Sequence, residues 1–385
     1  MFLGERATER SPRNNRGTAN RIEETGRQMN SPDVAARRPL GVGLVGAGLA
    51  TQSIHLPTLA GLADELRVVH VMDVLDDQAV AVAARVGARA GTSIEELLDD
   101  PAVDIVGVCS PHQFHAEHVI GACAAGKRAV FCEKPLTLTR NEAAEIQLAS
   151  ERFGVPVFVG TMNLWDPAAS AALAACGALR TEASMIRSTI LIPPNESLID
   201  LATDRIDRPM WLPPAPADMS PVQAAQYQLG RTILGLAVHG LALVRRFMPV
   251  VHEVTFARTI EPWGYVLSLT DGSRVARLMG MLGGSWDPEW TFTAIGPRSE
   301  LRIDFPPSYV LAGSATATVR HGAEQRTWRF GHGGFHAQWR HLADVARGHV
   351  APRVSVAEAV QDVVYALDVV TAAQARLVDE VSSEC

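Results

Sequence analysis

One lysine is the first candidate for chemistry in this chain. Of its 35 lysine and arginine residues, only Lys127 and Lys134 are lysines. An ammonium is compact and can lose its proton, whereas a guanidinium is planar and stays charged, so a lysine kept in such a chain indicates a site where arginine would fail. Lys134 follows the apolar run Ala129–Cys132 and Glu133. We interpret it as a catalytic group; the alternative is an ordinary cation at the end of a strand.

A glycine turn near the start of the globular part indicates a dinucleotide site. The apolar run Leu40–Val45 is followed by Gly46, Ala47 and Gly48 and then by a predicted helix. Glycines let the backbone approach a pyrophosphate, and the start of a helix offers it free amides. The third small position of the pattern holds Thr51, and a glycine pair alone is weak evidence because a tight turn without a ligand looks the same. The predicted pyrophosphate-binding residues are Gly46, Gly48, Leu49 and Ala50.

An acidic residue follows the next predicted strand. The run Leu66–Met72 stops at Asp73, 25 residues after Gly48. At a spacing of about 20 residues, a carboxylate in this fold accepts a hydrogen bond from the ribose 2′-hydroxyl. The same carboxylate would repel a 2′-phosphate, so Asp73 favours NAD over NADP. The alternative is a strand-end turn shared with Asp76 and Asp77.

Strands alternate with helices through residue 161. This order predicts a doubly wound parallel sheet with ligands at the carboxyl ends of its strands, where Asp73, Ser110 and Lys134 all fall. We assign residues 39–161 to a dinucleotide-binding domain and residues 1–38, rich in arginine and polar side chains, to a disordered tail. The predicted strands are Leu40–Val45, Leu66–Met72, Asp104–Val108, Ala129–Cys132 and Val155–Val159.

The second part of the chain, residues 162–385, has a different pattern. Strand-like runs separated by turn residues predict antiparallel pairing, and helices are expected at Pro167–Cys176, Pro221–Phe247, Phe335–Arg347 and Val356–Leu377. The second part of the chain therefore combines an antiparallel sheet with helices, and the fold class is α/β. An open sheet face favours a homodimer or homotetramer. The predicted strands are Ala183–Ile192, Val251–Thr259, Gly264–Leu269, Arg274–Met281, Trp290–Ile295, Leu301–Asp304, Ala315–Val319 and Arg326–Phe330.

Composition narrows the function classes. A net charge of -7 gives no electrostatic reason to bind nucleic acid or an anionic membrane, and no apolar run reaches the roughly 18 residues of a membrane-spanning helix. The five cysteines contain no close pair, so neither a disulfide framework nor a metal site is predicted. We expect a cytoplasmic protein.

The motifs together resemble the Gfo/Idh/MocA (glucose-fructose oxidoreductase, inositol dehydrogenase) family of oxidoreductases. The resemblance covers residues 40–167 and rests on the glycine turn with His55-Leu-Pro57, on Ser110-Pro111 with His115, on Ala125-Gly-Lys127, and on Glu133-Lys134-Pro135. It implies a nucleotide-binding domain followed by an α/β substrate-binding domain with a large open, mostly antiparallel sheet. It implies as well NAD(P)-dependent redox chemistry on sugars, cyclitols or their derivatives. It also implies that Ser110 and Pro111 line the nicotinamide ribose, that His115 supports the cofactor pocket, and that Glu133 and Lys134 lie beside the cofactor.

The second domain departs from the family around the substrate. The family places an aspartate four residues before a histidine on one helix, and the matching segment here has His239 as the histidine and Gly235 in place of the aspartate. Two of the usual upstream glycines are absent, and Leu164 stands where arginine is common. Loss of the carboxylate should weaken general-base catalysis by the imidazole. Tyr227, His332 and His336 are further acid or base candidates, each more readily explained as structural.

The sequence therefore predicts an NAD-dependent oxidoreductase acting on a hydroxyl or ketone of a sugar, aminosugar, nucleotide sugar or cyclitol. Lys134 would polarise the substrate oxygen and His239 would transfer the proton. Two alternatives remain: a non-catalytic or sensory NAD-binding homologue, favoured by Gly235 and Leu164, and a redox-neutral enzyme that retains its NAD.

Overall fold

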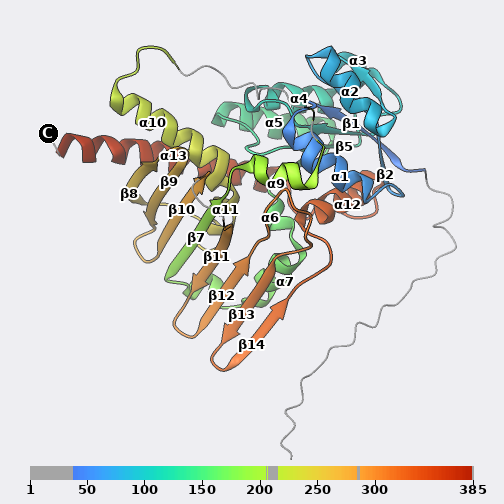
Figure 1. Cartoon of the computed structure of the whole chain (residues 1–385). Coiled ribbons are helices and arrows are strands. Elements are labelled where there is room, and N and C mark those ends of the chain that lie inside the picture. Colours follow the sequence, from blue (N-terminus) through green and yellow to red (C-terminus); the bar gives the residue numbers. More distant parts are fainter. Residues whose placement is uncertain (1–37, 205, 207–215, 284–286, 384–385) are drawn as a thin grey trace, which may run out of the picture. The chain divides into compact units, whose positions relative to one another are not determined.

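The computed structural model describes residues 38–383 apart from 205, 207–215 and 284–286. The described residues belong to one compact unit. The predicted tail, apart from Arg38, lies outside the described residues. The division at 161/162 stays a prediction, although each side of it holds its own sheet (Figure 1).

The first sheet has six parallel strands in the order β3-β2-β1-β4-β5-β6. This order is that of a doubly wound dinucleotide-binding fold and confirms the predicted fold class. Strand β3 was not predicted from the sequence, because three residues carry too little periodicity. The strands are β1 Leu40–Val45, β2 Leu66–Met72, β3 Arg89–Gly91, β4 Ile105–Val108, β5 Ala129–Cys132 and β6 Val157–Val159.

Helices and caps between these strands follow local sequence signals. Ser93 and Thr139 accept hydrogen bonds from backbone amides at the starts of α3 and α5, and Gly87 and Gly154 end α2 and α5 with φ of 65° and 67°. The helix predicted after Gly48 begins with a π-helical segment. The helices are η2 Thr51–His55, α1 Leu56–Ala60, α2 Asp76–Val86, α3 Ile94–Asp99, η3 His112–Phe114, α4 His115–Ala124 and α5 Arg140–Phe153.

The second sheet has eight strands in the order β14-β13-β12-β11-β7-β10-β9-β8. Its neighbours pair antiparallel except β7 and β10, which pair in parallel. The prediction of a mostly antiparallel sheet is therefore confirmed, and the one parallel pair arises because β7 enters the sheet centre before the chain leaves through helices. The strands are β7 Met185–Ile192, β8 Glu253–Ile260, β9 Gly264–Thr270, β10 Val275–Leu282, β11 Glu289–Ile295, β12 Ser299–Asp304, β13 Thr316–His321 and β14 Glu324–Trp328.

Helices pack on one side of this sheet. Residues along β10 alternate, with Ala276 and Leu278 buried and Val275 and Met279 exposed. In Figure 1, α10 and α13 run across the β8–β10 end of the sheet. The helix predicted over Pro221–Phe247 is interrupted by a π-helical segment. The helices are α6 Met162–Trp165, α7 Pro167–Ala175, α8 Leu179–Glu182, α9 Asn195–Ala202, α10 Pro221–Thr232, η4 Ile233–Ala237, α11 Val238–Val244, α12 Gly334–Ala346 and α13 Val356–Ser383.

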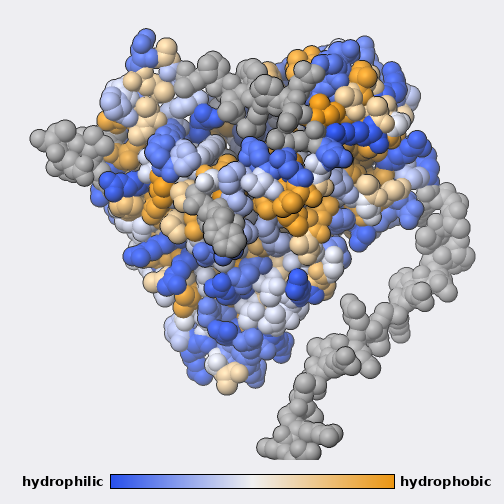
Figure 2. Space-filling view, in the orientation of Figure 1, coloured by the Kyte–Doolittle hydropathy of each residue, from blue (hydrophilic) through white to orange (hydrophobic). Residues whose placement is uncertain are grey.

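The outer surface is mixed in character. Figure 2 shows hydrophilic side chains over the β13–β14 hairpin and patches of hydrophobic ones nearer the helices. Within the described residues, no helix combines the length and apolar character needed to cross a membrane.

Trp339 of α12 joins the C-terminal part of the chain to the first sheet. Its side chain is fully buried and stacks on Phe131 of β5 with 4.8 Å between ring centroids. The indole Nε1 donates to Nδ1 of His55 at 3.2 Å. The ring therefore packs against the core and also satisfies a buried polar atom.

We expect Trp339→Ala to lower the free energy of unfolding by about 3–5 kcal/mol, because it leaves a large cavity and an unpaired imidazole nitrogen. Trp339→Phe, which keeps a ring and removes the donor, should cost about 1–3 kcal/mol. Urea denaturation measures both, with Trp328→Phe at the half-buried end of β14 as the control. A Trp339→Ala protein as stable as wild type would contradict this assignment.

Candidate active site and cofactor turn

The glycine turn leaves room for a phosphate. Gly46 has a φ of 97°, and a Cβ there would lie 2.7 Å from the carbonyl oxygen of Cys109. A Cβ on Gly48 would meet no atom within 4 Å. The Thr51 hydroxyl donates to the Gly46 carbonyl, which explains why threonine replaces a smaller residue here. The backbone of Gly48, Leu49 and Ala50 is therefore open to a ligand where the helical turns begin, and it fits a pyrophosphate.

Asp73 holds the glycine turn against the end of β2. Its Oδ2 accepts from the Ala47 amide at 2.8 Å and its Oδ1 from the Leu75 amide at 3.0 Å. The sequence did not reveal this structural function. A carboxylate oxygen can accept more than one hydrogen bond, so these contacts leave the carboxylate able to accept from a ribose hydroxyl. That contact stays a prediction.

His115 connects the Ser110 loop to the turn that carries Lys134. It is fully buried, and its Nδ1 and Nε2 face the carbonyl oxygens of Pro135 and Ser110 at 2.8 and 2.9 Å. Burial lowers the pKa of His115, although the two carbonyls act in the opposite direction. The side chain of Ser110 is held in turn by Nδ1 of His118 at 2.9 Å. These contacts fix the backbone of Ser110 and Pro111; their contact with a nicotinamide ribose stays a prediction.

Glu133 is a buried carboxylate with defined partners. Its Oε1 lies 2.9 Å from Nε2 of His55, and its Oε2 accepts from the Lys134 amide at 3.0 Å. Burial alone would raise the pKa of Glu133, but His55 and the positive charge of Lys134 bring it down to about 2. The carboxylate is therefore ionised and positions the lysine turn. Its predicted place beside the cofactor is not tested by these contacts.

The ammonium of Lys134 reaches from the first sheet to the helices of the second part of the chain. Its Nζ donates to the carbonyl oxygen of Gly235 in η4 at 2.9 Å. Burial lowers the pKa of Lys134, and the charge of Glu133 partly offsets that effect. Lys127, the other lysine, donates to the carbonyls of Asp100 and Val103 and is structural. Only one of the two lysines therefore lies where both parts of the chain meet.

His239 lies in α11, four residues after Gly235. Its ring packs edge-on against Trp290 with 5.2 Å between centroids, and its Nδ1 is buried with no hydrogen-bond partner among the described residues. Burial, and then the positive charge of Lys134, lower the pKa of His239 well below its usual value. The imidazole is therefore neutral at pH 7 and able to accept a proton.

Gly235 leaves no carboxylate beside these groups. A Cβ at this position would lie 3.3 and 3.4 Å from two carbons of the Trp263 ring, so the indole borders the space that an aspartate would need. Sequence reasoning missed Trp263, and also Tyr309, whose pKa is raised to about 12 by burial and by the charges of Glu133 and Glu196. Neither residue belongs to a motif that would single it out.

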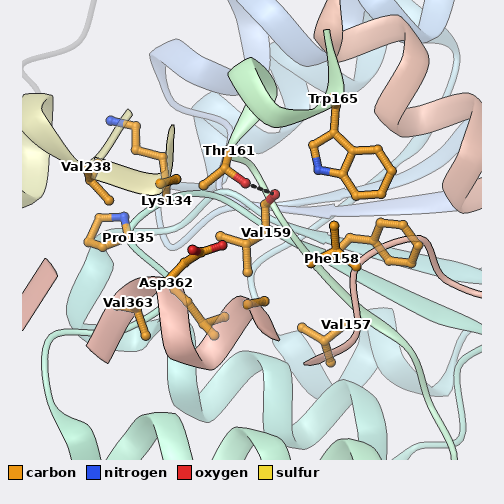
Figure 3. A pocket seen from close by; sticks show the side chains of 14 residues that line it. Lys134, Pro135, Val157, Phe158, Val159, Thr161, Trp165, Val238, Asp362 and Val363 are labelled. Atoms are coloured by element: carbon orange, nitrogen blue, oxygen red, sulfur yellow. Dashed lines mark hydrogen bonds between the residues drawn. The ribbon is translucent and has the colours of Figure 1, made fainter. Parts of the chain in front are cut away.

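Lys134 also lines a cleft (Figure 3), but the carboxylate in this cleft already has partners. The ammonium lies on the side of this cleft away from Trp165, and most of the lining is aliphatic. The carboxylate of Asp362 pairs with Nε of Arg245 at 2.5 Å and Nη2 of Arg246 at 3.1 Å. This cleft is therefore a packing seam beneath α13 instead of the reaction site.

The remaining acid and base candidates have other surroundings. Tyr227 stacks with Arg231, at 5.6 Å from the guanidinium carbon to the ring centroid. His332 and His336 line a second cleft with Asn163 and Asp166 at the start of α12. No group of three or more His, Cys, Asp or Glu side chains in the described ranges could hold a metal ion.

The fold and the turn define a protein with a dinucleotide-binding Rossmann domain and a second, open-sheet part. Residues 40–161 match the family described as the oxidoreductase family with an NAD-binding Rossmann fold, Gfo/Idh/MocA. The match covers the first domain, where the motifs predicted it.

Individual relatives match over limited lengths. Inositol 2-dehydrogenase 3 of Saccharopolyspora erythraea is 39% identical over 126 residues, which are 32% of this chain and 37% of that protein. The match thus covers just over a third of that relative.

Solved structures match over most of the chain at low identity. They include UDP-N-acetylglucosamine 3-dehydrogenase GnnA of Acidithiobacillus ferrooxidans, with a TM-score of 0.64, 19% identity, and coverage of 88% of this chain and 99% of that one. A 3-ketoreductase of Actinomadura kijaniata has a TM-score of 0.63 and 18% identity, covering 88% and 97%. At such identity these structures support the fold alone, including the second part of the chain.

The positive charge of Lys134 acts on the imidazole of His239. We expect Lys134→Met to raise the pKa of His239 toward its ordinary value, because removal of a neighbouring positive charge makes the imidazolium less unfavourable. NMR titration of histidine-labelled protein measures this pKa. Arg152→Gln, which removes an exposed charge at the end of α5, should leave it unchanged. An identical His239 titration in the wild type and the Lys134→Met variant would show that the two side chains do not interact.

Proposed function

We propose that this protein is an NAD-dependent oxidoreductase acting on a hydroxyl or ketone of a sugar, aminosugar, nucleotide sugar or cyclitol. The observation that carries the proposal is the position of Lys134, which donates to Gly235 one helical turn before a neutral His239. Oxidising a carbinol removes a hydride from carbon and a proton from oxygen, and leaves a carbonyl. Lys134 polarises the oxygen, and His239 accepts the proton or returns it in the opposite direction.

The cofactor is held by residues of the first domain. The backbone of Gly46, Gly48, Leu49 and Ala50 binds the pyrophosphate, and Asp73 accepts from the adenosine ribose. Ser110 and Pro111 line the nicotinamide ribose, supported by His115. Bound NAD supplies a hydride acceptor or, when reduced, a hydride donor.

The names of the relatives support the substrate class. Among the relatives matched by sequence is an inositol 2-dehydrogenase, which acts on a cyclitol. The competing function is a sensory NAD-binding homologue, favoured by Gly235 because the usual carboxylate is absent. A homodimer or homotetramer joined through the exposed face of the second sheet is part of the proposal.

Lys134→Met should reduce kcat by roughly 10²- to 10⁴-fold, the range typical of a positioned proton-transfer or polarising group. Lys134→Arg should not restore turnover, because a planar guanidinium cannot replace a compact ammonium. NADH formation with a panel of sugars and cyclitols measures turnover, and NADH fluorescence titration checks that cofactor binding persists. Full turnover by Lys134→Met would exclude the assigned role. Cofactor binding without turnover of any substrate by the wild type would favour the sensory function.

Cofactor preference depends on Asp73. The 3-ketoreductase of similar fold was crystallised with NADP, so the preference requires a direct test. We expect wild-type protein to bind NAD more tightly than NADP, and Asp73→Ser to narrow or reverse this difference because the repulsion of the 2′-phosphate is removed. Calorimetric titration with both cofactors measures the two dissociation constants. Asp76→Ser, at the start of α2, is the control. Tighter NADP binding by the wild type would refute the preference.

A further inference from the structure

A second cation lies one helical turn from the carbonyl that holds Lys134. Arg231 is at the end of α10, four residues before Gly235, which corresponds to about 6 Å along the helix axis. The Trp263 ring connects the two positions. A Cβ on Gly235 would lie 3.3 Å from this ring, and the ring centroid lies 5.6 Å from the guanidinium carbon of Arg231.

The guanidinium is held by aromatic rings and not by acids. Tyr227, on the same helix, is also 5.6 Å from it, so the cation contacts two rings. The turn that carries Trp263 is itself tied to α10, since Gln228 donates to the Pro262 carbonyl at 3.3 Å. Among the described residues Arg231 has no ion pair, and the side chain remains partly exposed. Its hydrogen-bond donors are therefore oriented and available.

Two cations, Lys134 and Arg231, lie near Gly235. Lys134 and Arg231 are both cations, Gly235 contributes no side chain, and the nearby carboxylate of Glu133 is occupied by His55 and the Lys134 amide. The pKa of His112, in the Ser110 loop, is lowered to about 3. Burial is the largest cause, and the charges of Lys134, His115 and Arg231 act in the same direction, whereas Glu133 opposes them. A neutral polyol would leave Arg231 without a partner.

We propose that Arg231 binds a carboxylate or phosphate of the substrate, which makes the substrate an anionic sugar or cyclitol. A guanidinium matches either group with two parallel hydrogen bonds, and the cation–π contacts with Tyr227 and Trp263 hold it beside these rings. Arg231 and the carbonyl that holds Lys134 lie about one helical turn apart, so a ligand that contacts both cations carries its anionic group at a different position from the oxygen that Lys134 polarises. This inference rests on the proposed oxidoreductase function and specifies its substrate.

The test compares matched neutral and anionic substrates with the full chain and NAD. The pairs are D-glucose with D-glucuronate, D-glucose with D-glucose 6-phosphate, and myo-inositol with its 1-phosphate. Wild-type kcat/KM should be higher for an anionic member, and the preferred pair distinguishes carboxylate from phosphate. Arg231→Gln should lose roughly 10- to 100-fold in kcat/KM for that anion and change little for the neutral partner. Arg231→Lys should recover part of the loss.

Controls separate this role from others. Arg152→Gln removes an exposed arginine that also contacts a ring, Phe153, and should behave as wild type. The KM for NAD should stay unchanged in Arg231→Gln. A raised KM for NAD with an unchanged anion preference would assign Arg231 to the cofactor and overturn the inference. Equal anion-to-neutral ratios in wild type and Arg231→Gln would also overturn it.

Calorimetric binding of the same ligands to NADH-loaded protein distinguishes the two proposals. If an anion binds only when Arg231 is present and no substrate is turned over, the oxidoreductase function is contradicted and the anion site is supported. If no anionic member of the panel binds or reacts, the inference is wrong.

Discussion

The buried carboxylate of Glu133 is the interaction on which the arrangement of this site depends. A buried charge is costly unless it is paired and hydrogen-bonded. Here Nε2 of His55 and the amide of Lys134 contact its two oxygens, and Trp339 donates to the other nitrogen of His55. This orientation requires the proton of His55 on Nε2, facing the carboxylate. One carboxylate thus joins the helix after the glycine turn, the end of β5 and α12.

The hydrogen bonds of Glu133 also restrict the position of Lys134. Because the Glu133 carboxylate accepts a hydrogen bond from the Lys134 amide, the turn cannot move without breaking one of the hydrogen bonds that hold this carboxylate. The side chain is fixed at its other end by the Gly235 carbonyl, inside one of the two π-helical segments of the described residues. Such segments are rare and occur often at functional sites. The other one, η2, ends at His55, so both segments lie at the ends of the same chain of contacts.

The sequence predicted the first domain well because its motifs are local. Glycines, strand-end acids and the Glu133-Lys134 turn each act through backbone geometry within a few residues, and the parallel sheet follows from alternating elements. Strand β3 and the parallel pairing of β7 with β10 could not be predicted, since one is too short and the other depends on where a strand enters the sheet. In the same way, the contact of Asp73 with the Ala47 amide required the fold.

The surroundings of Gly235 could be predicted from the sequence only in part. Alignment to a motif identified the missing carboxylate at Gly235, but it could not say what occupies the space. The structure places the Trp263 ring there, brought by the β8–β9 hairpin, and the arginine one turn earlier packs on that ring. A carboxylate at position 235 would have neutralised part of the positive charge around Lys134. In its absence, burial and then the positive charge of Lys134 lower the pKa of His239, against the effect of Glu133, so the imidazole is a weaker base but stays unprotonated near neutrality. The same positive charge favours an anionic ligand, so the residue change that weakens one catalytic group also defines which substrates the site can hold.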